Sequence, residues 1–389
     1  MSVIAEIEDL RRLYQRRTPR MFCDFVESGS WSEQTLRANT GDFKHLRLRQ
    51  RVAVDMSNRS TRTTMIGQDA AMPVALAPVG LTGMQCADGE IKAARAAEKF
   101  GVPYTLSLLS ICSIEDVAEH TTRPFWFQVY TLKDEDFMRR LFDRARAAQC
   151  AAIVITLDLQ VLGQRHKDLH NGLSAPPRLT LRNLANIMTK VQWGLGMLGT
   201  KRRAFGNVVG HAKGVTDPGS ISAWTAEAFD ETLDWDRVAQ FRDMWGGKLI
   251  LKGILDVEDA IKAADLGVDA IIVSNHGGRQ LDGAMSSIRM LPQIVDAVGD
   301  RVEVHMDGGI RSGQDVLKAL SLGARATHIG RAFTYGLGAM GEEGVTRALQ
   351  VIHKELDTTM ALCGARDVHD LGPDNLIIPQ GFDDPTVTL

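Results

Sequence analysis

Short apolar runs alternate with amphipathic stretches over most of the chain, beginning near residue 72. Apolar runs bounded by turn residues are typical of strands in a parallel sheet whose outer face is covered by helices. Such runs occur at residues 72–78, 103–107, 125–130, 151–158, 248–253, 270–275, 302–307 and 326–330. Helical spacing is found at residues 89–101, 134–149, 257–267 and 313–323. Several of these predicted helices end in glycine, which favours the left-handed backbone of a helix C-terminus.

This series of eight strands predicts an α/β fold, a (β/α)8 TIM barrel. We expect one domain over residues 1–389, with a short N-terminal helical extension over 1–71 and a long insertion over 159–232 after the fourth strand. A connection of that length is unusual in a compact domain and is commonly a lid. Residues 181–213 within it combine apolar patches with the basic TKRR sequence (200–203), so a membrane-surface contact is the alternative.

Composition narrows the function classes. Hydrophobic residues make up 44% of the chain and charged residues 24%, as in a globular protein with a full core. The net charge of −3 gives no reason to expect a nucleic-acid partner. The five cysteines include no C-x-x-C pair, so neither a disulfide framework nor a zinc knuckle is indicated. The N-terminus lacks a secretory signal and no transmembrane helix is expected, which favours a cytoplasmic protein.

In this fold, chemistry is expected where the strands end. The sixth predicted strand runs into the turn SNHGGRQ, which presents His276 and Arg279. Asp158, at the end of the fourth strand, could orient the imidazole and favour its protonated form once it has taken a proton. Arg165 and Arg279 suit a carboxylate held by two guanidinium groups. The sequence therefore predicts that His276 is a proton-abstracting base and that it lies beside a site for a carboxylate.

Glycine-rich turns follow the seventh and eighth predicted strands, in DGGIRSG (307–313) and IGRAF (329–333). Backbone N–H groups of such turns can converge on a phosphate, and this is the usual phosphate position of the barrel. Arg311 and Arg331 can add charge-assisted hydrogen bonds. Asp307 could hold a ribityl or ribose hydroxyl. The alternative is that these glycines only cap helices.

Lys252 lies in a strand otherwise made of leucine and isoleucine. A buried lysine is costly unless it meets an anion. It either pairs with a core carboxylate or faces a cofactor atom that gains negative charge on reduction. His305, His328 and His353 are expected to be structural. The sequence HKDLH (166–170) offers two histidines but no third ligand, so no metal site is predicted.

Together these motifs resemble the FMN-dependent α-hydroxy acid dehydrogenases and oxidases, a family that includes glycolate oxidase, lactate oxidase and (S)-mandelate dehydrogenase. The motifs are SNHGGRQLD (274–282), DGGIRSG (307–313), LKGI (251–254), FQVY (127–130) and GRAF (330–333). The resemblance covers nearly the whole chain. Two stretches, MPVALAPVGLTGM (72–84) and RHKDLHNGLSAPP (165–177), look most like the bacterial respiratory-type L-lactate dehydrogenases. FMN as cofactor and a homotetramer are what the resemblance implies.

The resemblance also implies a role for each site residue. His276 would be the base that removes a proton from the substrate, and Asp158 would stabilise the resulting imidazolium. The two arginines would bind the substrate carboxylate, and Tyr130 would hydrogen-bond near the substrate oxygen. Lys252 would face flavin N1 and stabilise the reduced anion. Cofactor contacts are implied for Ala77, Pro78, Val79, Ser107, Gln128, Thr156, Lys252, Ser274, Asp307, Gly308, Gly309, Arg311, Gly330 and Arg331.

Two positions expected to contact the substrate depart from the family pattern. Phe25 stands where members commonly have a tyrosine whose phenol helps bind the carboxylate. A lost hydrogen bond to a charged group is worth ~1.5–3 kcal/mol, which weakens binding by about one to two decades. Leu109 stands where glycolate oxidases tend to have a tryptophan, so a substrate side chain larger than that of glycolate is expected to fit.

The expected reaction is oxidation of a lactate-like L-2-hydroxy acid to the 2-oxo acid, with electrons passed to a quinone- or cytochrome-type acceptor. The near alternatives are an oxidase that reduces O2 to H2O2 and an (S)-mandelate-type dehydrogenase. A redox-free phosphate-binding barrel would leave Lys252, His276 and the paired arginines without a common purpose. A non-catalytic binding barrel is the remaining alternative. Residues 181–213 would provide peripheral contact with the inner membrane face.

Overall fold

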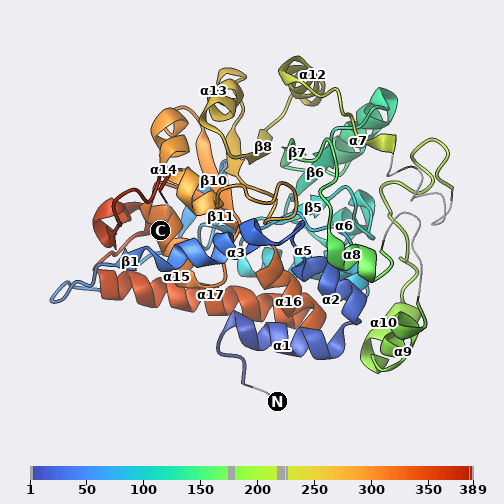
Figure 1. Ribbon diagram of the computed structural model, residues 1–389, viewed down its shortest axis with the longest axis horizontal. Helices are drawn as coiled ribbons and strands as arrows, with labels where there is room; N and C mark the ends of the chain where they lie inside the picture. The colour runs from blue at the N-terminus through green and yellow to red at the C-terminus, as the bar shows by residue number, and fades with distance from the viewer. Residues whose placement is uncertain (1–2, 174–179, 217–223, 225–226, 385, 388–389) are drawn as a thin grey trace.

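A nearly closed barrel of parallel strands forms the centre of the computed structural model (Figure 1). Its eight strands, counted over the described residues, are β4 (Val74–Leu76), β5 (Thr105–Ser107), β6 (Trp126–Tyr130), β7 (Ala152–Thr156), β8 (Leu249–Ile254), β9 (Ala270–Val273), β10 (Glu303–Asp307) and β11 (Ala326–Ile329). Each lies within one predicted apolar run, except that β8 extends one residue beyond its run, to Ile254. They follow the order β4-β11-β10-β9-β8-β7-β6-β5, and a bridge between Leu76 and Tyr104 joins the two ends. The predicted TIM barrel is confirmed.

Helices surround the strands and cover their outer face. They are α4 (Thr82–Gln85), α5 (Gly89–Phe100), α6 (Ile114–His120), α7 (Glu135–Ala147), α12 (Trp235–Trp245), α13 (Val257–Asp265), α14 (Ser287–Val298), α15 (Gly313–Ser321), α16 (Arg331–Met340) and α17 (Glu342–Cys363). The four predicted helices correspond to α5, α7, α13 and α15. α5 ends at Gly101, whose φ of 87° is left-handed, so the glycine signal identified a real C-cap.

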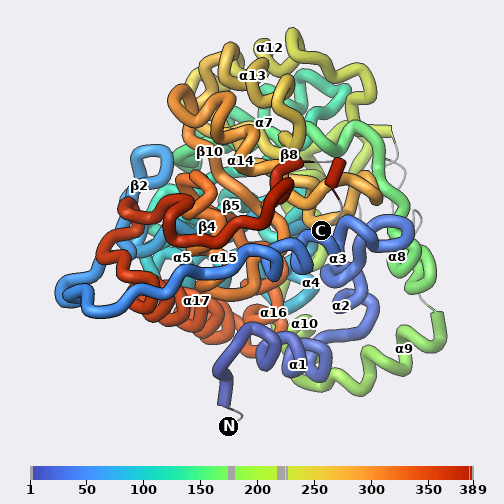
Figure 2. Tube along the Cα trace, turned by 60° about the vertical axis from the view of Figure 1, so that its left-hand side comes forward, coloured from blue at the N-terminus to red at the C-terminus, as the bar shows by residue number. Residues whose placement is uncertain are grey.

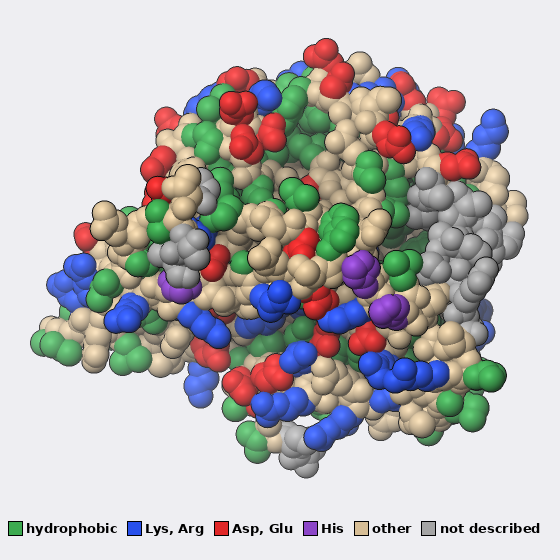
Figure 3. Space-filling view, viewed as in Figure 1, with side chains coloured by type: hydrophobic (Ala, Val, Ile, Leu, Met, Phe, Trp, Pro, Cys, Tyr) green, Lys and Arg blue, Asp and Glu red, His purple; other side chains and the backbone are tan. Residues whose placement is uncertain are grey.

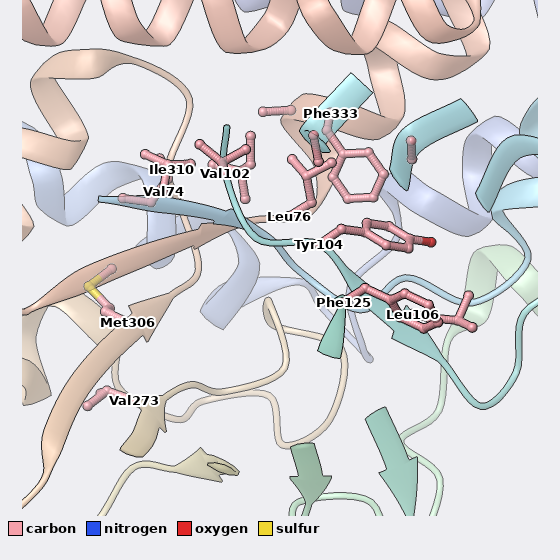
Figure 4. Packing of buried hydrophobic residues seen from close by; sticks show 14 of the residues in the cluster. Val74, Leu76, Val102, Tyr104, Leu106, Phe125, Val273, Met306, Ile310 and Phe333 are labelled. Carbon is pink, nitrogen blue, oxygen red and sulfur yellow. The ribbon is translucent and has the colours of Figure 1, made fainter. Parts of the chain in front are cut away.

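Two apolar layers stabilise the barrel. Between strands and helices, side chains such as Leu76 and Tyr104 pack near Phe333 of α16 (Figure 4). A smaller apolar layer lies in the barrel interior and contains Ala75, Trp126, Ala152, Val154, Ile250, Ala270, Ile272 and Ala326. The hairpin of β2 (Thr63–Met65) and β3 (Gln68–Ala70) adds Met65 and Ile66 to this interior layer. The amino-terminal end of the barrel is thereby closed.

The N-terminal extension pairs with a segment near the C-terminus and contacts the turn that follows β9. It contains α1 (Ile7–Arg17), α2 (Arg20–Glu27), α3 (Gln34–Gly41), the 3-10 helix η1 (Asp42–Lys44) and β1 (Arg47–Leu48). α1 lies beside α16, as Figures 1 and 2 both show. β1 pairs with β12 (Leu376–Ile377) near the C-terminus, after η2 (Val368–Asp370) and η3 (Pro373–Asn375). The Ser30 N–H donates to the Gly278 carbonyl oxygen at 2.9 Å, which ties the extension to the turn after β9.

The insertion after β7 contains α8 (His166–His170), α9 (Leu181–Met188) and α10 (Val191–Gly199), and α9 projects at the edge of the molecule in Figure 2. The structure describes residues 3–173, 180–216, 224, 227–384 and 386–387. Parts of the predicted 159–232 insertion, and the end of the 165–177 motif, therefore lie outside the described residues. Within the described ranges, no helix is both long and apolar enough to cross a membrane.

Candidate active site

A cavity of about 330 Å³ lies where the strands of the barrel end, and most of the predicted site residues line it. Those at its wall are Phe25, Ala77, Pro78, Val79, Leu109, Gln128, Tyr130, Thr156, Arg165, Lys252, His276, Arg279, Asp307, Gly308, Gly309, Arg311, Gly330 and Arg331. Three others, Ser107, Asp158 and Ser274, are not at the wall but hydrogen-bond to residues that are. The fold thus brings residues from distant parts of the sequence, predicted at the strand ends, together around one cavity.

His276 and Asp158 form a hydrogen-bonded pair at one side of the cavity. His276 follows β9 with a φ of 57°, and its Nδ1 lies 2.8 Å from Asp158 Oδ1. Asp158 is accommodated by a bulge in β8 at Gly253, whose φ is 97°. A Cβ on Gly253 would lie 2.6 Å from Asp158 Cγ, so the glycine makes room for the carboxylate.

The electrostatics of the pair suit a base. Burial lowers the pKa of His276; Asp158 opposes the shift, Lys252 adds to it, and the result lies below the ordinary histidine value. Burial would raise the pKa of Asp158, but His276 and Lys252 outweigh it and the pKa lies below its usual value. A neutral imidazole that donates Nδ1–H to this carboxylate presents the lone pair of Nε2 for a proton.

Two guanidinium groups face the same cavity. Arg279 Nη1 donates to the carbonyl oxygens of Phe25 and Ser28 at 2.6 and 2.9 Å, and Arg279 Cζ lies 4.9 Å from the centre of the Phe25 ring. Arg165 Nη1 lies 3.9 Å from Asp168 Oδ2. Burial lowers the pKa of both arginines. Two guanidiniums beside one carboxylate leave an excess of positive charge that favours an anionic substrate.

Lys252 pairs with a buried carboxylate and also lines the cavity. Its Nζ lies 3.1 Å from Asp307 Oδ2 and donates to Ser274 Oγ at 2.9 Å. Burial would lower the pKa of Lys252, but Asp307 and Asp158 outweigh it and the pKa is raised. The salt bridge to a carboxylate is therefore present, yet both partners also line the cavity. The lysine is held charged at the floor of the pocket.

A row of polar side chains fixes the neighbouring wall. Ser107 Oγ donates to Gln128 Oε1, and Gln128 Nε2 donates to Thr156 Oγ1, both at 3.0 Å. These bonds set the amide orientation of Gln128 across three adjacent strands. Ala77 and Gly330 also line the cavity, and a Cβ on Gly330 would lie 3.9 Å from that of Ala77. We call the part of the cavity lined by Gln128, Ala77 and Gly330 the ring slot, since polar and small residues of this kind suit a flat ring system.

The glycines after β10 and β11 shape the other end of the cavity. Gly308 and Gly309 have φ values of 96° and 88°, and a Cβ on Gly309 would lie 1.9 Å from the Asn39 carbonyl oxygen. Gly330 caps the N-terminus of α16, where first-turn N–H groups lack helical partners. Such a terminus is a favourable phosphate site. Gly309 makes room for the Asn39 backbone and Gly330 caps α16, and the phosphate site at these glycines stays a prediction.

The two arginines predicted for the phosphate differ in their surroundings. Arg331 donates through Nε, Nη1 and Nη2 to the carbonyl oxygens of Val26, Gly277 and Ser28, at 2.8, 3.0 and 3.0 Å. Burial, assisted by Arg311, lowers the pKa of Arg331 to about 10. Arg331 thus also holds the N-terminal extension in place. By contrast, Arg311 Nη1 donates to the carbonyl oxygen of its neighbour Ile310 at 2.7 Å.

The insertion supplies wall residues that the strand-end reasoning missed. They are Leu159, Leu162, Asp168, Leu173, Phe205 and Phe229. The Phe229 ring meets that of Tyr130 edge-on at 5.5 Å. Asp168 was considered only within a possible metal motif, and no spacing signal identifies the apolar members. His328, expected to be structural, also lines the cavity.

Residues 14–378 match the FMN-dependent dehydrogenase family. The chain belongs to this family. An L-lactate dehydrogenase from Caulobacter vibrioides is 47% identical over 371 residues, covering 94% of this chain and 96% of the relative. An L-lactate dehydrogenase from Pectobacterium atrosepticum is 44% identical, covering 96% and 97%. The resemblance seen in the sequence motifs is therefore confirmed, and with it an enzyme that uses FMN.

Solved structures agree with this membership. The crystal structure of a monotopic membrane protein, (S)-mandelate dehydrogenase, superposes with a TM-score of 0.92 at 34% identity, covering 97% of this chain and all of that one. A mandelate oxidase bound to benzoylformic acid superposes with a TM-score of 0.81 at 35% identity, covering 96% and 98%. Both dehydrogenases and an oxidase thus share this architecture.

The cavity of this FMN-dependent dehydrogenase fits the cofactor. Asp307 Oδ1 is buried without a hydrogen-bond partner among the described residues and can accept from a ribityl hydroxyl. The cradle at Gly308 and Gly309, with the N-terminus of α16, can take the phosphate. The slot beside Gln128 can take the isoalloxazine ring. FMN supplies the two-electron acceptor that no protein side chain provides.

Proposed function

We propose that this FMN-dependent dehydrogenase oxidises a lactate-like L-2-hydroxy acid to the 2-oxo acid. The observation that supports it most is the placement of the His276–Asp158 pair and the Arg165–Arg279 pair at one cavity. A 2-hydroxy acid needs a base for its proton and a cationic site for its carboxylate. The names of the bacterial relatives agree with lactate as the first substrate to test.

Each side chain has a distinct task in this proposal. The two arginines hold the carboxylate and thereby orient the hydroxyl-bearing carbon. His276 Nε2 accepts the proton, and Asp158 stabilises the imidazolium that results. Tyr130, which is 9% exposed, hydrogen-bonds to the substrate oxygen. Lys252 keeps positive charge beneath the ring slot, where negative charge develops on reduction.

We assign the apolar side of the cavity to the substrate side chain. Leu109, Phe205 and Phe229 line it, and two of the three come from the insertion. The insertion then serves as a lid that excludes water, within a single domain over residues 1–389. An (S)-mandelate-type substrate is the second candidate, because an aryl group is compatible with these apolar side chains.

A visible spectrum of the purified protein tests this proposal. The flavin bands should bleach on anaerobic addition of L-lactate, and a panel of L- and D-2-hydroxy acids, including both mandelates, then ranks the substrates. Rapid recolouring in air would indicate an oxidase that makes H2O2, whereas slow recolouring supports transfer to a quinone or cytochrome. Flavin that no L-2-hydroxy acid bleaches would overturn the proposal, and absence of bound flavin would favour the redox-free barrel.

Peripheral membrane contact is a second proposal, for the described part of the insertion. Leu181, Met188 and Leu198 are 86%, 71% and 75% exposed. In Figure 3, apolar side chains lie beside Lys and Arg side chains at the lower right, where Figure 1 places α9 and α10. Apolar residues flanked by cations are typical of interfacial helices. The related (S)-mandelate dehydrogenase is described as a monotopic membrane protein.

Flotation with vesicles containing anionic lipid tests the contact. Wild type should float with the vesicles, and Leu181→Asp with Met188→Asp should abolish flotation without affecting flavin bleaching. Equal flotation of this double variant would contradict the proposal.

We also propose that the protein is a cytoplasmic homotetramer that contacts the inner face of the membrane. The mass of the particle, measured by light scattering, tests the homotetramer.

A further inference from the structure

Two histidines lie in the interior of the barrel, where the other side chains are almost all apolar. His305 and His328 are 0% and 1% exposed. Trp126 stacks on His305 at 6.4 Å between ring centres and is tilted toward His328 at 5.8 Å. Burying polar rings costs free energy unless they are hydrogen-bonded. A packed apolar interior would not need them, so their presence calls for a functional explanation.

The histidines form a hydrogen-bonded column with Glu303. His305 Nε2 lies 3.1 Å from Glu303 Oε2, and His305 Nδ1 lies 3.1 Å from His328 Nε2. The Ile66 N–H also donates to Glu303 Oε2, at 3.0 Å. Because Glu303 as a carboxylate accepts from His305, and neutral His305 then accepts from His328, the column has a defined direction. It ends in a lone pair on His328 Nδ1.

The two ends of the column face different cavities. Glu303, whose side chain is 30% exposed, lines a cavity of about 630 Å³ at the amino-terminal end of the barrel, together with Arg325 and Asp269. His328 lines the cofactor cavity. It is paired in register with Asp307 across β10 and β11. His328 Nδ1 and Asp307 Oδ1 are both buried without a partner among the described residues. The column thus spans the barrel interior.

We propose that Glu303, His305 and His328 relay protons between the cofactor cavity and the opposite end of the barrel. A proton accepted at His328 Nδ1 releases the Nε2 proton of His328 to His305 Nδ1. His305 then passes its own Nε2 proton to Glu303, which delivers it to water. One proton enters, one leaves, and only N–H···N and N–H···O hydrogen bonds are exchanged. The proposal rests on FMN binding and not on which hydroxy acid is oxidised.

The chemistry of a flavin dehydrogenase creates a need for such a route. Oxidation of a secondary alcohol to a ketone removes two electrons and two protons. His276 takes one proton on the substrate side of the cavity. The other must return to water when an electron acceptor reoxidises the cofactor, and bound substrate or product covers the substrate side. The column offers this proton a path to water through the barrel interior, away from the substrate side of the cavity.

The surrounding charges favour this direction of transfer. Burial, His305 and Lys252 keep the pKa of His328 well below its usual value, so it does not retain a proton. At the other end, burial would raise the pKa of Glu303, but hydrogen bonds from His305 and Ile66, with the charge of Arg325, outweigh it. Glu303 therefore releases its proton readily. Asp307 is the carboxylate on the cofactor side, already paired with Lys252.

Glu303→Gln provides the sharpest test because it keeps an acceptor oxygen for His305 and Ile66 but cannot take up a proton. The FMN-loaded protein is photoreduced without any hydroxy acid, saturated with oxalate, a carboxylate with no hydroxyl to oxidise that covers the substrate side, and mixed with ferricyanide in weakly buffered solution containing a pH dye. Flavin recolouring and proton release should both be slowed about tenfold or more relative to wild type. His353→Leu, outside the column, should behave as wild type. Wild-type kinetics in Glu303→Gln would overturn the relay.

A second pair of variants separates a relay from a structural role. His305→Leu leaves His328 Nε2 unpaired and should lower stability, whereas His305→Leu with His328→Leu removes both polar rings and should recover it. A relay predicts slow proton release in both variants. Slow release in the single variant that recovers with stability in the double variant would show that the column is structural and would overturn the proposal.

Discussion

His276 Nδ1 lies 2.8 Å from Asp158 Oδ1, which joins the turn after β9 to the end of β7. The contact fixes the imidazole plane and the tautomer, so Nε2 is the nitrogen available to a substrate. Arg165 and Arg279 line the same cavity as His276. In the proposed reaction they bind the carboxylate, so a substrate needs both a carboxylate and a neighbouring hydroxyl to use the whole site.

Asp158→Asn should slow flavin reduction by L-lactate by about 10²–10⁴-fold, because the imidazolium loses its counter-charge. Reduction needs neutral His276, so the rate rises with pH through the pKa of His276, which lies below its ordinary value. Asp158 raises that pKa, so its removal should move the acid limb to lower pH. Stopped-flow reduction across the pH range measures both effects. An acid limb that moves to higher pH would contradict the assignment.

Phe25→Tyr should tighten binding of the substrate carboxylate. The Phe25 ring already lies 4.9 Å from Arg279 Cζ, so a phenol hydroxyl is added beside the anion site. A hydrogen bond to a charged group is worth ~1.5–3 kcal/mol, which corresponds to a Kd lower by about one to two decades. Titration of the flavin spectrum with 2-oxo acid measures it. Phe25→Leu is the control and should not gain affinity; an equal gain would show that packing, not the hydroxyl, is responsible.

Lys252→Met should lower stability and slow reduction together. It leaves Asp307 buried without its cation, which costs about 3–5 kcal/mol in comparable pairs. Adding Asp307→Asn should restore much of the unfolding free energy but not the reduction rate, since the positive charge beneath the ring slot is still missing. Denaturant unfolding and anaerobic reduction are the two measurements. Recovery of the rate in the double variant would show that Lys252 acts only through the ion pair.

Gly309→Ala should lose FMN. The added Cβ would lie 1.9 Å from the Asn39 carbonyl oxygen, and the φ of 88° is strained for alanine. Fluorescence titration of the apoprotein with FMN should show a Kd at least about tenfold higher. Gly41→Ala is the matched control because no neighbouring atom lies within 4 Å of its added Cβ. Tight FMN binding by Gly309→Ala would exclude this turn from the phosphate site.

The barrel and the residues gathered at its strand ends could be predicted because both depend on local sequence. An apolar run followed by a glycine turn, as at His276 and Asp307, identifies a strand and its exit without knowledge of distant partners. The same pattern singled out Lys252, which lines the cavity. The sequence could not decide between an ion pair and a cofactor contact for Lys252; the structure shows the ion pair with Asp307, and the cofactor contact stays a prediction.

Residues that reach the site through tertiary folding could not be predicted. Phe229 lies about 100 residues from Tyr130 in the sequence (positions 229 and 130), yet their rings are 5.5 Å apart. Nothing in the composition of the insertion indicates which of its apolar residues turn inward. Likewise, His305 and His328 are spaced as ordinary strand residues. Only the in-register pairing of β10 with β11 brings their rings together.

The rate of anaerobic flavin reduction in His276→Gln tests the central claim most directly. The variant should bind FMN and L-lactate as wild type does, because the cofactor and carboxylate sites are untouched. Its flavin should bleach at least about 10³-fold more slowly than that of wild type, since the glutamine amide cannot take up the proton that His276 accepts in the proposed reaction. Bleaching at the wild-type rate would show that His276 is not the base.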